Sequence, residues 1–420
     1  MKYDVIVVGA GASGIIAAGQ AAKLGLKVLL VEKMRRAGRK LLITGKGRCN
    51  ITQYAPQSDY FQNIFPNPRF LKPAFHTFFV EDILKILHDQ GVATTTERGS
   101  RVFPVSNSAK EVVDGLMRWM GTKNISTVYN FRVNSLVIDD GKMMGVAGIG
   151  EKGHEVFEAP NVIICTGGKS YPATGSTGDG YDLARQAGHT VTPVFPALVP
   201  LVTEGNLAER LQGLGLKNVK ASVWVNSKKL RDEFGEVMFA HYGLSGPIIL
   251  TLSRFIVEQL NPKNKVEISI DLKPALDEQK LDARLLRDLN EHGKKQIENI
   301  FKLWLPAKMI PVFLDLLELD AKKLCHQVNA KERRRIMLLM KDMRLQVTGH
   351  PGYKEAIITA GGVATQEVQS KTMESKMVKG LYFAGEVLDL DGNTGGYNLQ
   401  LAFSTAWLAA LSCAEKKGTV

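Results

Sequence analysis

Three glycines and one glutamate near the start of the chain have the types and the spacing that a dinucleotide site requires. Gly9, Gly11 and Gly14 form a G-x-G-x-x-G run, and Glu32 follows it. The first glycine permits a tight turn, the second lets the backbone approach a pyrophosphate, and the third lets a helix lie close to a strand. A carboxylate about 20 residues further on can accept hydrogen bonds from ribose hydroxyls. These residues predict a dinucleotide-binding site.

The elements that must position these residues can be identified around them. We expect a strand, a helix and a second strand ending in Glu32, at residues 3–8, 13–24 and 27–31. The first N–H groups of the helix, near Ala12 and Ser13, carry roughly half a positive charge, which suits a pair of phosphates. An isolated glycine run would be weak support, but this one occurs in the setting that the chemistry needs.

The composition is that of an ordinary chain with two or three domains. The 420 residues are 45% hydrophobic and 23% charged, which allows a substantial core. Residues 5–22 carry no charge, but the glycines within them and Asp4 before them argue against a secretory or membrane segment, so we expect no membrane association. The four cysteines are far apart, which excludes a familiar zinc framework, predicts no metal site and points to a reducing cytoplasm. They are Cys49, Cys165, Cys325 and Cys413.

The net charge of +12, from 54 basic and 42 acidic residues, is the unusual feature of the composition. An excess of one sign favours polyanionic partners, nucleic acid among them. Alternatively, mild basicity is common among bacterial cytosolic proteins, and a dinucleotide diphosphate needs part of this charge. Both interpretations stay open.

A basic, glycine-rich loop follows Glu32. Residues 33–58 contain seven basic side chains and no acidic one, and glycines alternate with the cations. Such a backbone can fold tightly and present both N–H groups and charge to the second half of a dinucleotide or to the edge of its ring system. A solvated basic loop is the alternative. The residues expected to contact the cofactor are Lys33, Arg39, Lys40, Gly45, Arg48, Cys49 and Asn50, with the cysteine as a small lining residue.

Glycine turns recur after two later strands. A buried strand at 161–165 ends in Thr166, Gly167 and Gly168, where the backbone is expected to pass close to the cofactor again. A second strand ends at Gly385 and Glu386. The helix that follows it runs to about residue 414. Its first residues are Gly396, Tyr397, Asn398 and Leu399. Since no second G-x-G-x-x-G run lies between a predicted strand and a predicted helix, the two ends of the chain are expected to share one dinucleotide fold.

The remaining elements suggest an insertion. Helices are expected at 74–90 and 110–120, and the strands 124–129, 134–139 and 142–149 are expected to form a β-meander. Prolines then break the chain from residue 193. Short strands follow at 198–202, 221–225, 237–239 and 266–270, and residues 273–343 are helical and charged.

We therefore predict an α/β fold with two insertions. The dinucleotide-binding domain comprises residues 1–192 and 355–420, the β-rich insert 193–272 and 341–354, and the helical insert 273–340. Within the helical insert, a basic cluster is the best candidate for a surface that faces RNA. It consists of Lys331, Arg333, Arg334 and Arg335.

Four stretches resemble a known family. They are residues 38–50 with Thr52, 101–104, 239–247 (FAHYGLSGP) and 385–400. With them the chain resembles, over nearly its whole length, the bacterial HI0933-like flavoproteins, described as predicted NAD(P)/FAD-dependent oxidoreductases. The resemblance implies a Rossmann-type FAD-binding domain with a two-motif site, interrupted by a β-barrel-like domain and a helical domain. It also implies non-covalent FAD, with NAD(P)H as a possible transient reductant.

The resemblance further implies reduction of an activated C=C bond. The substrates named for the family are unsaturated steroid-type acids and a uracil of large-subunit ribosomal RNA, which would become dihydrouridine. Flavin N5 would deliver hydride to the carbon β to a carbonyl, and an acid would protonate the α carbon. Amides at the helix start, those of Tyr397, Asn398 and Leu399, would stabilise the charge on reduced flavin.

The proton donor is open, because no candidate forms an unambiguous acid–base pair. The candidates for protonation or for polarisation of the carbonyl are His241, Tyr242, Arg101 and Lys46. His241 can equally be a hydrogen-bonded turn residue before Gly243. A second function also stays open, that of an RNA- or ribosome-associated flavoprotein whose basic insert is a binding module.

Overall fold

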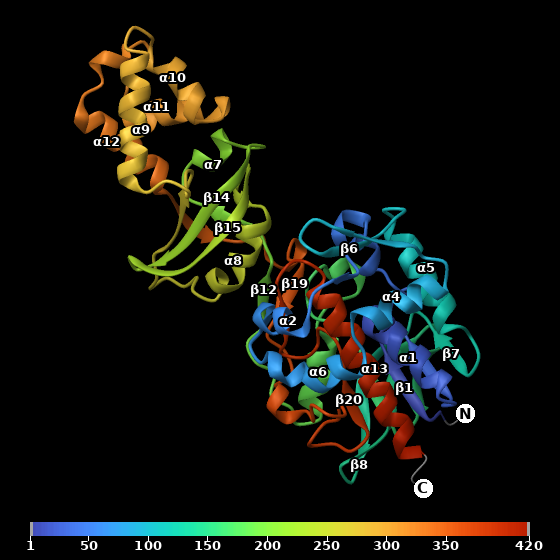
Figure 1. Cartoon of the computed structure of the whole chain (residues 1–420). Coiled ribbons are helices and arrows are strands. Elements are labelled where there is room, and N and C mark those ends of the chain that lie inside the picture. Colours follow the sequence, from blue (N-terminus) through green and yellow to red (C-terminus); the bar gives the residue numbers. More distant parts are fainter. Residues whose placement is uncertain (1–2, 418–420) are drawn as a thin grey trace. The chain divides into compact units, whose positions relative to one another are not determined.

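The computed structural model describes residues 3–417 and divides the chain into two compact units, shown in Figure 1. The first unit consists of Met1–Pro196 and Ala356–Val420, and the second of Ala197–Glu355. Among residues 3–417, none of the helices combines the length and the apolar character that a membrane crossing needs.

A parallel five-stranded sheet forms the centre of the first unit, in the order β20-β11-β1-β2-β7. Its strands are short runs of mostly valine, isoleucine and leucine, a composition typical of parallel strands covered on both faces. Their bounds are β1 Val5–Val8, β2 Val28–Val31, β7 Ile125–Val128, β11 Val162–Ile164 and β20 Leu381–Phe383. The predicted Rossmann-type α/β fold is confirmed.

The strand order creates a switch point at the carboxyl end of β1. From β1 the sheet extends to β2 and β7 on one side and to β11 and β20 on the other. Ligands of such sheets bind in the crevice at this point. Helix α1 (Ala12–Lys23) begins there and packs against the long C-terminal helix α13 (Tyr397–Lys417).

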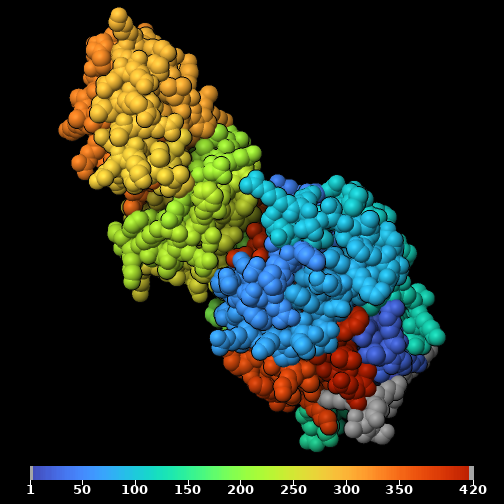
Figure 2. Space-filling view, in the orientation of Figure 1, coloured from blue at the N-terminus to red at the C-terminus, as the bar shows by residue number. Residues whose placement is uncertain are grey.

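The other elements of the first unit surround this sheet. Two three-stranded sheets and one two-stranded sheet are antiparallel. Their strands are β3 Thr52–Gln53, β5 Thr94–Glu97 and β6 Arg101–Pro104; β8 Arg132–Asp139, β9 Lys142–Gly150 and β10 Gly153–Glu158; and β4 Ile64–Phe65 with β21 Asp391–Gly392. The helices are α2 Gln57–Asn63, α3 Lys72–Thr77, α4 Val80–Asp89, α5 Ala109–Met120 and α6 Asp179–Gln186. Figure 2 shows the blue region of α2–α4 beside the orange and red C-terminal region.

Two predicted elements differ from the structure. The helix expected at 74–90 is broken into α3 and α4, because the N–H of Phe79 is capped by the Asp82 carboxylate at 2.7 Å and a new helix starts there. The strand expected at 124–129 is not part of the meander. It is β7, parallel to β2 at the edge of the main sheet, and the meander is completed by β10 instead.

The second unit contains a closed barrel of six strands in the order β13-β16-β15-β14-β17-β18. The strands are β13 Leu201–Thr203, β14 Gly215–Val225, β15 Lys228–Ala240, β16 Gly243–Ser245, β17 Val266–Asp271 and β18 Met343–Gly349. Helix α8 (Pro247–Val257) packs closely on β15, since a Cβ on Gly235 would lie 2.7 Å from Ile248. The expected strand at 198–202 is shorter, because Leu198 has a φ of 50°.

Four longer helices complete the second unit, together with the short α7 (Leu207–Arg210). They are α9 Glu278–Glu291, α10 Ile297–Trp304, α11 Ile310–Leu317 and α12 Ala330–Lys341. Their apolar faces and the barrel interior form one hydrophobic core, which includes Phe301, Phe313 and Val223.

Candidate active site

The three glycines of the first turn have different surroundings. A Cβ on Gly9 would lie 2.7 Å from the carbonyl oxygen of Cys165, and one on Gly14 would lie 1.8 Å from the carbonyl oxygen of Gly9. These two positions exclude any side chain because the protein itself occupies the space. A Cβ on Gly11 would meet no atom within 4 Å. Gly11 therefore faces open space at the switch point, where a pyrophosphate can approach the backbone.

Glu32 is held beside this turn by backbone donors. Its Oε2 accepts from the N–H of Ala10 at 2.7 Å, and its Oε1 accepts from the N–H of Met34 at 2.8 Å. Each carboxylate oxygen can accept a second hydrogen bond. The carboxylate is therefore fixed beside the first turn and can still accept hydrogen bonds from a ligand.

Lys33 is engaged within the protein. Its Nζ lies 2.6 Å from Asp179, and Arg132 lies 2.9 Å from the same carboxylate. Burial alone would raise the pKa of Asp179, but the hydrogen bond and the charge of Lys33 hold that pKa below its usual value. The charge of Lys33 is thus largely neutralised by a residue at the start of α6.

Lys40 and Glu386 join the two motifs of the site. The Nζ of Lys40 lies 2.7 Å from Oε2 of Glu386 and 3.1 Å from the hydroxyl of Ser170. Oε1 of Glu386 accepts from Ser170 at 2.9 Å and from the N–H of Thr359 at 2.9 Å. The ion pair is largely buried and hydrogen-bonded on both sides, so it fixes four chain segments relative to one another.

The glycines after the other strands also serve close packing. A Cβ on Gly168 would lie 2.5 Å from the hydroxyl of Thr359, and one on Gly385 would lie 2.8 Å from Oγ of Ser13. Gly167 has a φ of 71°, which a side chain rarely adopts. The two later turns therefore lie directly against the first, as the prediction of a shared site requires.

Four further residues predicted at the site either contact other protein groups, are buried, or are exposed to solvent. Arg48 pairs with Glu97, donates to Asn107 at 2.6 Å and covers the ring of Phe103 at 4.1 Å. Cys49 is fully buried, and burial raises the pKa of its thiol to about 11, so it is not a thiolate. The two catalytic candidates of this unit, Lys46 and Arg101, have exposed side chains.

Three buried polar atoms of the same region lack a hydrogen-bond partner among the described residues. They are Nε of Arg39, Oδ1 of Asn50 and Oε1 of Gln53. Buried polar atoms are nearly always paired in folded proteins, so unpaired ones mark a place where a ligand completes the set. Together with the open space at Gly11, they fit the polar atoms of a flavin dinucleotide. Gly45, also predicted here, lies at a kink within the 3-10 helix Leu41–Gly47, and Thr166 lies just after β11.

The start of α13 is fastened to β3. Thr52 donates to Oε1 of the buried Gln400 at 2.7 Å, and a Cβ on Gly396 would lie 2.4 Å from the carbonyl carbon of Thr52. Asn398 stabilises the preceding turn, since its side chain accepts from the N–H of Gly392 and donates to the carbonyl oxygen of Gly392. The first N–H groups of a helix have no acceptor within the helix. The first N–H groups of α13 are therefore held in place next to β3 and can donate to a ligand.

His241 and Tyr242 belong to the second unit, between β15 and β16. Their rings meet edge to face at 4.7 Å, and the Tyr242 hydroxyl donates to Glu355 at 2.8 Å. Burial, followed by the neighbouring Glu355 carboxylate, raises the pKa of Tyr242 to about 12. The phenol is therefore a neutral donor, and the catalytic role of both residues stays a prediction.

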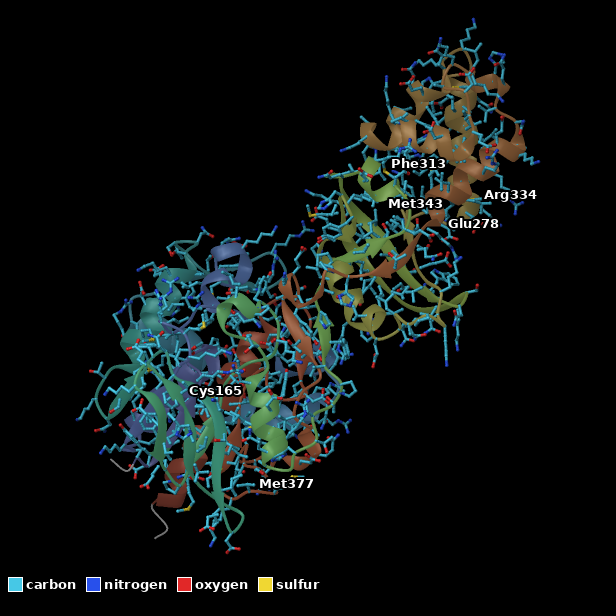
Figure 3. The ribbon with its side chains drawn as sticks, turned by 180° about the vertical axis from the view of Figure 1, so that it is seen from behind. Cys165, Glu278, Phe313, Arg334, Met343 and Met377 are labelled. Atoms are coloured by element: carbon cyan, nitrogen blue, oxygen red, sulfur yellow. The ribbon has the colours of Figure 1, made fainter. Side chains whose placement is uncertain are left out.

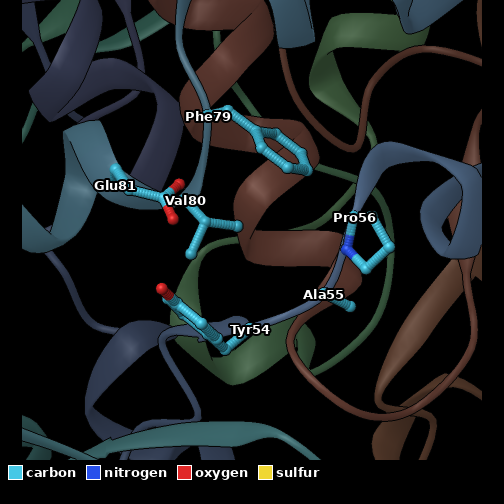
Figure 4. Close-up of a pocket in the computed structure, with 6 residues that line it drawn as sticks. All are labelled: Tyr54, Ala55, Pro56, Phe79, Val80 and Glu81. Carbon is cyan, nitrogen blue, oxygen red and sulfur yellow. The ribbon is translucent and has the colours of Figure 1, made fainter.

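A pocket of the first unit, drawn in Figure 4, includes the residues that directly follow β3 in the chain. It is lined by Tyr54, Ala55, Pro56, Phe79, Val80 and Glu81. The ring of Tyr54 is half exposed, and Glu81 adds a carboxylate. The pocket therefore offers a flat aromatic surface and a hydrogen-bond acceptor.

Sequence reasoning missed Gln53, Ser170 and Thr359. Ser170 and Thr359 each lie near a glycine turn, but they meet across 189 residues of chain, which local spacing does not predict. The sequence signal for Gln53 was its position next to Thr52, at the edge of a stretch that carries the family resemblance. Among the described residues, no group of three or more His, Cys, Asp or Glu side chains is arranged to hold a metal ion.

The fold and this site define a flavoprotein built on a Rossmann-type sheet. The pattern described as the HI0933-like protein Rossmann domain matches residues 3–412, so the chain belongs to the HI0933-like family of FAD-dependent oxidoreductases. The resemblance predicted from four sequence stretches is thus confirmed.

Similar proteins extend over nearly the whole chain. A ribosomal RNA dihydrouridine synthase of Escherichia coli is 33% identical over 410 residues, which are 97% of each chain. A 3-dehydro-bile acid delta(4,6)-reductase of Clostridium scindens is 30% identical over 412 residues, 98% of each. A ribosomal RNA dihydrouridine synthase of Haemophilus influenzae is 28% identical over 415 residues, again 98% of each.

Solved structures share the fold. The Sdh1 complex of Mycobacterium smegmatis aligns with a TM-score of 0.53 at 19% identity and covers 100% of this chain and 69% of that chain. A 3-ketosteroid delta1-dehydrogenase of Sterolibacterium denitrificans aligns with a TM-score of 0.50 at 13% identity, covering 99% of this chain and 100% of that one. These similarities show that the fold is shared.

Proposed function

We propose that this protein reduces a conjugated C=C bond with FAD, and that its substrate is a uracil of ribosomal RNA, which becomes dihydrouridine. The observation that carries the reaction type is the similarity over at least 97% of the chain to two proteins of different substrate class. One is named for dihydrouridine and the other for a delta(4,6)-reductase, and both products have lost a C=C bond next to a carbonyl system.

The choice of RNA rests on two further observations. Two of the three full-length relatives are named for ribosomal RNA, including the most similar of the three. The net charge of +12 favours a polyanionic substrate over a small acid. A steroid-type acid is the alternative substrate, and it is an arm of the experiment below.

The residues of the first unit hold the cofactor in this proposal. The backbone at Gly11 and the start of α1 bind the pyrophosphate, and Glu32 binds the ribose. The first N–H groups of α13, those of Tyr397, Asn398 and Leu399, stabilise negative charge on the N1–C2=O edge of the flavin. Bound and reduced FAD supplies a hydride from N5 to the carbon β to the substrate carbonyl.

Polar groups outside the proposed FAD site polarise the substrate carbonyl and donate the proton. We assign polarisation of the substrate carbonyl to Arg101 and Lys46, because both side chains are exposed and can reach a substrate. His241 is our choice of proton donor, since imidazole is the commonest general acid in enzymes. The Tyr242 phenol is engaged with Glu355 and is the weaker candidate. NAD(P)H is the proposed reductant and binds transiently, because the other G-x-G-x-x-G run, at residues 148–153, joins β9 to β10 and opens no helix.

The test is a half-reaction with purified protein. FAD in the protein is reduced anaerobically with dithionite and mixed with a ribosomal RNA fragment that contains unmodified uridine, or with an unsaturated 3-keto bile acid. We expect the RNA to restore the visible absorbance of oxidised flavin and to gain dihydrouridine by mass spectrometry. A Gly11→Val protein, without FAD, is the control and should give neither signal.

The outcomes separate the alternatives. Reoxidation by the bile acid alone would replace the RNA substrate with a steroid-type acid and leave the C=C chemistry in place. Reoxidation by neither compound, with RNA still bound by the protein, would contradict the reductase proposal and favour an RNA-associated flavoprotein.

A further inference from the structure

Gln53 is a buried residue with only half of its amide engaged. It is the last residue of β3 and is 9% exposed. Its Nε2 donates to the carbonyl oxygen of Gly99 at 2.6 Å, which fixes the orientation of the amide. Its Oε1 is buried and receives no donor from the described residues. A buried carbonyl without a donor is costly, so this oxygen has the properties of a preformed acceptor.

The free oxygen lies at the turn that precedes α13. A Cβ on Gly395 would be 3.2 Å from Oε1 of Gln53, and the next residue, Gly396, is in close contact with the backbone of Thr52. Helix α13 begins one residue later, at Tyr397. One fixed acceptor therefore adjoins the first N–H donors of a helix.

An acceptor beside a row of donors complements an imide, in which an N–H lies between two carbonyl groups. We propose that Oε1 of Gln53 accepts a hydrogen bond from an imide N–H whose neighbouring carbonyl is bound at the start of α13. Two molecules in the proposed reaction carry this group: the pyrimidine ring of the flavin, and the uracil of the substrate. The uracil alternative rests on the proposed function, whereas the flavin alternative does not.

Three variants separate the acceptor from the rest of the side chain. Gln53→Met keeps the length but removes the acceptor, and Gln53→Glu keeps an acceptor while losing the donor to Gly99. Gln57→Met is the matched control, because Gln57 also donates to a backbone carbonyl, that of Phe75 at 3.1 Å, and lies in α2.

FAD affinity is the first readout and needs no turnover. Apoprotein is titrated with FAD by fluorescence, and folding is checked by circular dichroism. If the flavin is the partner, the FAD dissociation constant rises about tenfold in Gln53→Met, less in Gln53→Glu, and not in Gln57→Met. The wild-type protein should also bind N3-methyl FAD about tenfold more weakly than FAD, which tests the same bond even where a variant fails to fold.

Substrate saturation is the second readout. If uracil is the partner, FAD affinity is unchanged in Gln53→Met, but KM for uridine RNA rises about tenfold while KM for an unsaturated bile acid does not. An unchanged FAD affinity in the variant and with N3-methyl FAD, together with an unchanged KM for RNA, would overturn the proposal. A wild-type protein that reduces neither substrate would contradict the proposed function and with it the uracil alternative, and the FAD titrations would then decide the flavin alternative by themselves.

Discussion

The ammonium of Lys40 lies 2.7 Å from Oε2 of Glu386, a residue 346 positions later in the chain. This ion pair connects the basic loop of the N-terminal half with the C-terminal flavin motif. Both side chains are only about one-fifth exposed, at 22% and 19%, so the pair is partly shielded from solvent.

Replacement of Glu386 by glutamine should destabilise the first unit. The amide keeps the size but leaves the Lys40 charge without a counter-ion, a loss of about 2 kcal/mol for a hydrogen bond to a charged group. Urea unfolding of the apoprotein measures this change. Lys85→Met, which removes an exposed i,i+4 pair with Asp89, is the control and should cost about 0.5 kcal/mol or less. Equal changes in the two variants would mean that solvent screens the Lys40 pair as well.

Substitution of Gly11 should abolish FAD binding, whereas substitution of Gly14 should lower the stability of the apoprotein. Gly11→Val places a side chain into open space, so the protein should fold and lose FAD. Gly14→Ala forces a Cβ to within 1.8 Å of the Gly9 carbonyl and should lower the melting temperature of the apoprotein. Differential scanning calorimetry and the flavin absorbance of the purified proteins distinguish the two. A folded Gly11→Val protein that keeps FAD would remove the basis of the site.

Glu32→Ala should weaken FAD binding by about 2–3 kcal/mol, the range for hydrogen bonds to a charged group. The structure adds a second effect, because the N–H groups of Ala10 and Met34 lose their acceptor. The apoprotein should therefore also lose stability. Titration calorimetry with FAD measures the first effect, and thermal unfolding without FAD measures the second. Unchanged affinity would show that the carboxylate serves only the turn.

The basic cluster on α12 is smaller than the sequence suggests. Arg333 forms a two-point ion pair with Asp282, whereas Lys331, Arg334 and Arg335 are exposed and share one helix face. Figure 3 labels Arg334 on the outside of the helical part. Each phosphate neutralised on single-stranded RNA contributes about 0.7 to the slope of log affinity against log salt. Three Gln substitutions should therefore flatten the slope by about 2.

The control for this prediction carries the same change of charge on the first unit. Gln at Lys123, Lys142 and Lys152, all exposed, lowers the net charge from +12 to +9, as the α12 variant does. Fluorescence anisotropy with a ribosomal RNA fragment over a salt series gives both slopes. If the two variants behave alike, RNA responds to net charge and not to the α12 face.

Acid should destabilise the first unit through His189. This buried imidazole contacts Glu367 at 3.2 Å and Ser375 at 2.7 Å. Burial lowers its pKa below the usual 6.5, although Glu367 opposes this. The unfolded chain therefore binds a proton more readily than the folded one, and stability falls as pH decreases from about 6.5. The lowered pKa of Glu367 acts in the same direction at lower pH.

Urea unfolding of the apoprotein between pH 7.5 and pH 5 measures this dependence. His189→Gln keeps a polar side chain that does not titrate, so its stability should depend less on pH. An equally steep dependence in that variant would assign the acid sensitivity to other groups.

The strand–helix–strand unit of the expected dinucleotide site could be predicted because it is local. Gly9, Gly11, Gly14 and Glu32 follow one another within this unit, and the roles proposed for them rest on their spacing. The break between α3 and α4 was missed because the apolar period continues across Phe79 and the capping contact by Asp82 is not a periodic feature.

Long-range partners could not be predicted in the same way. The charges of Lys33, Lys40 and Arg48 suggested cofactor contacts, but each has a carboxylate partner in the fold that spacing alone does not identify. The place of β7 was missed for a related reason, because an alternating strand does not identify its neighbour. Gln53 became a candidate only once its neighbours were known.

The interrupted first unit has a consequence for the order of events during synthesis on the ribosome. Residues 197–355 are contiguous, so the barrel and its helices can fold as soon as they have emerged. The sheet of the first unit lacks its edge strand β20 until residue 383 is made, and α1 lacks α13 until later still. Since the proposed flavin site needs residues from both ends of the chain, we expect the inserted unit to fold first and FAD to bind last.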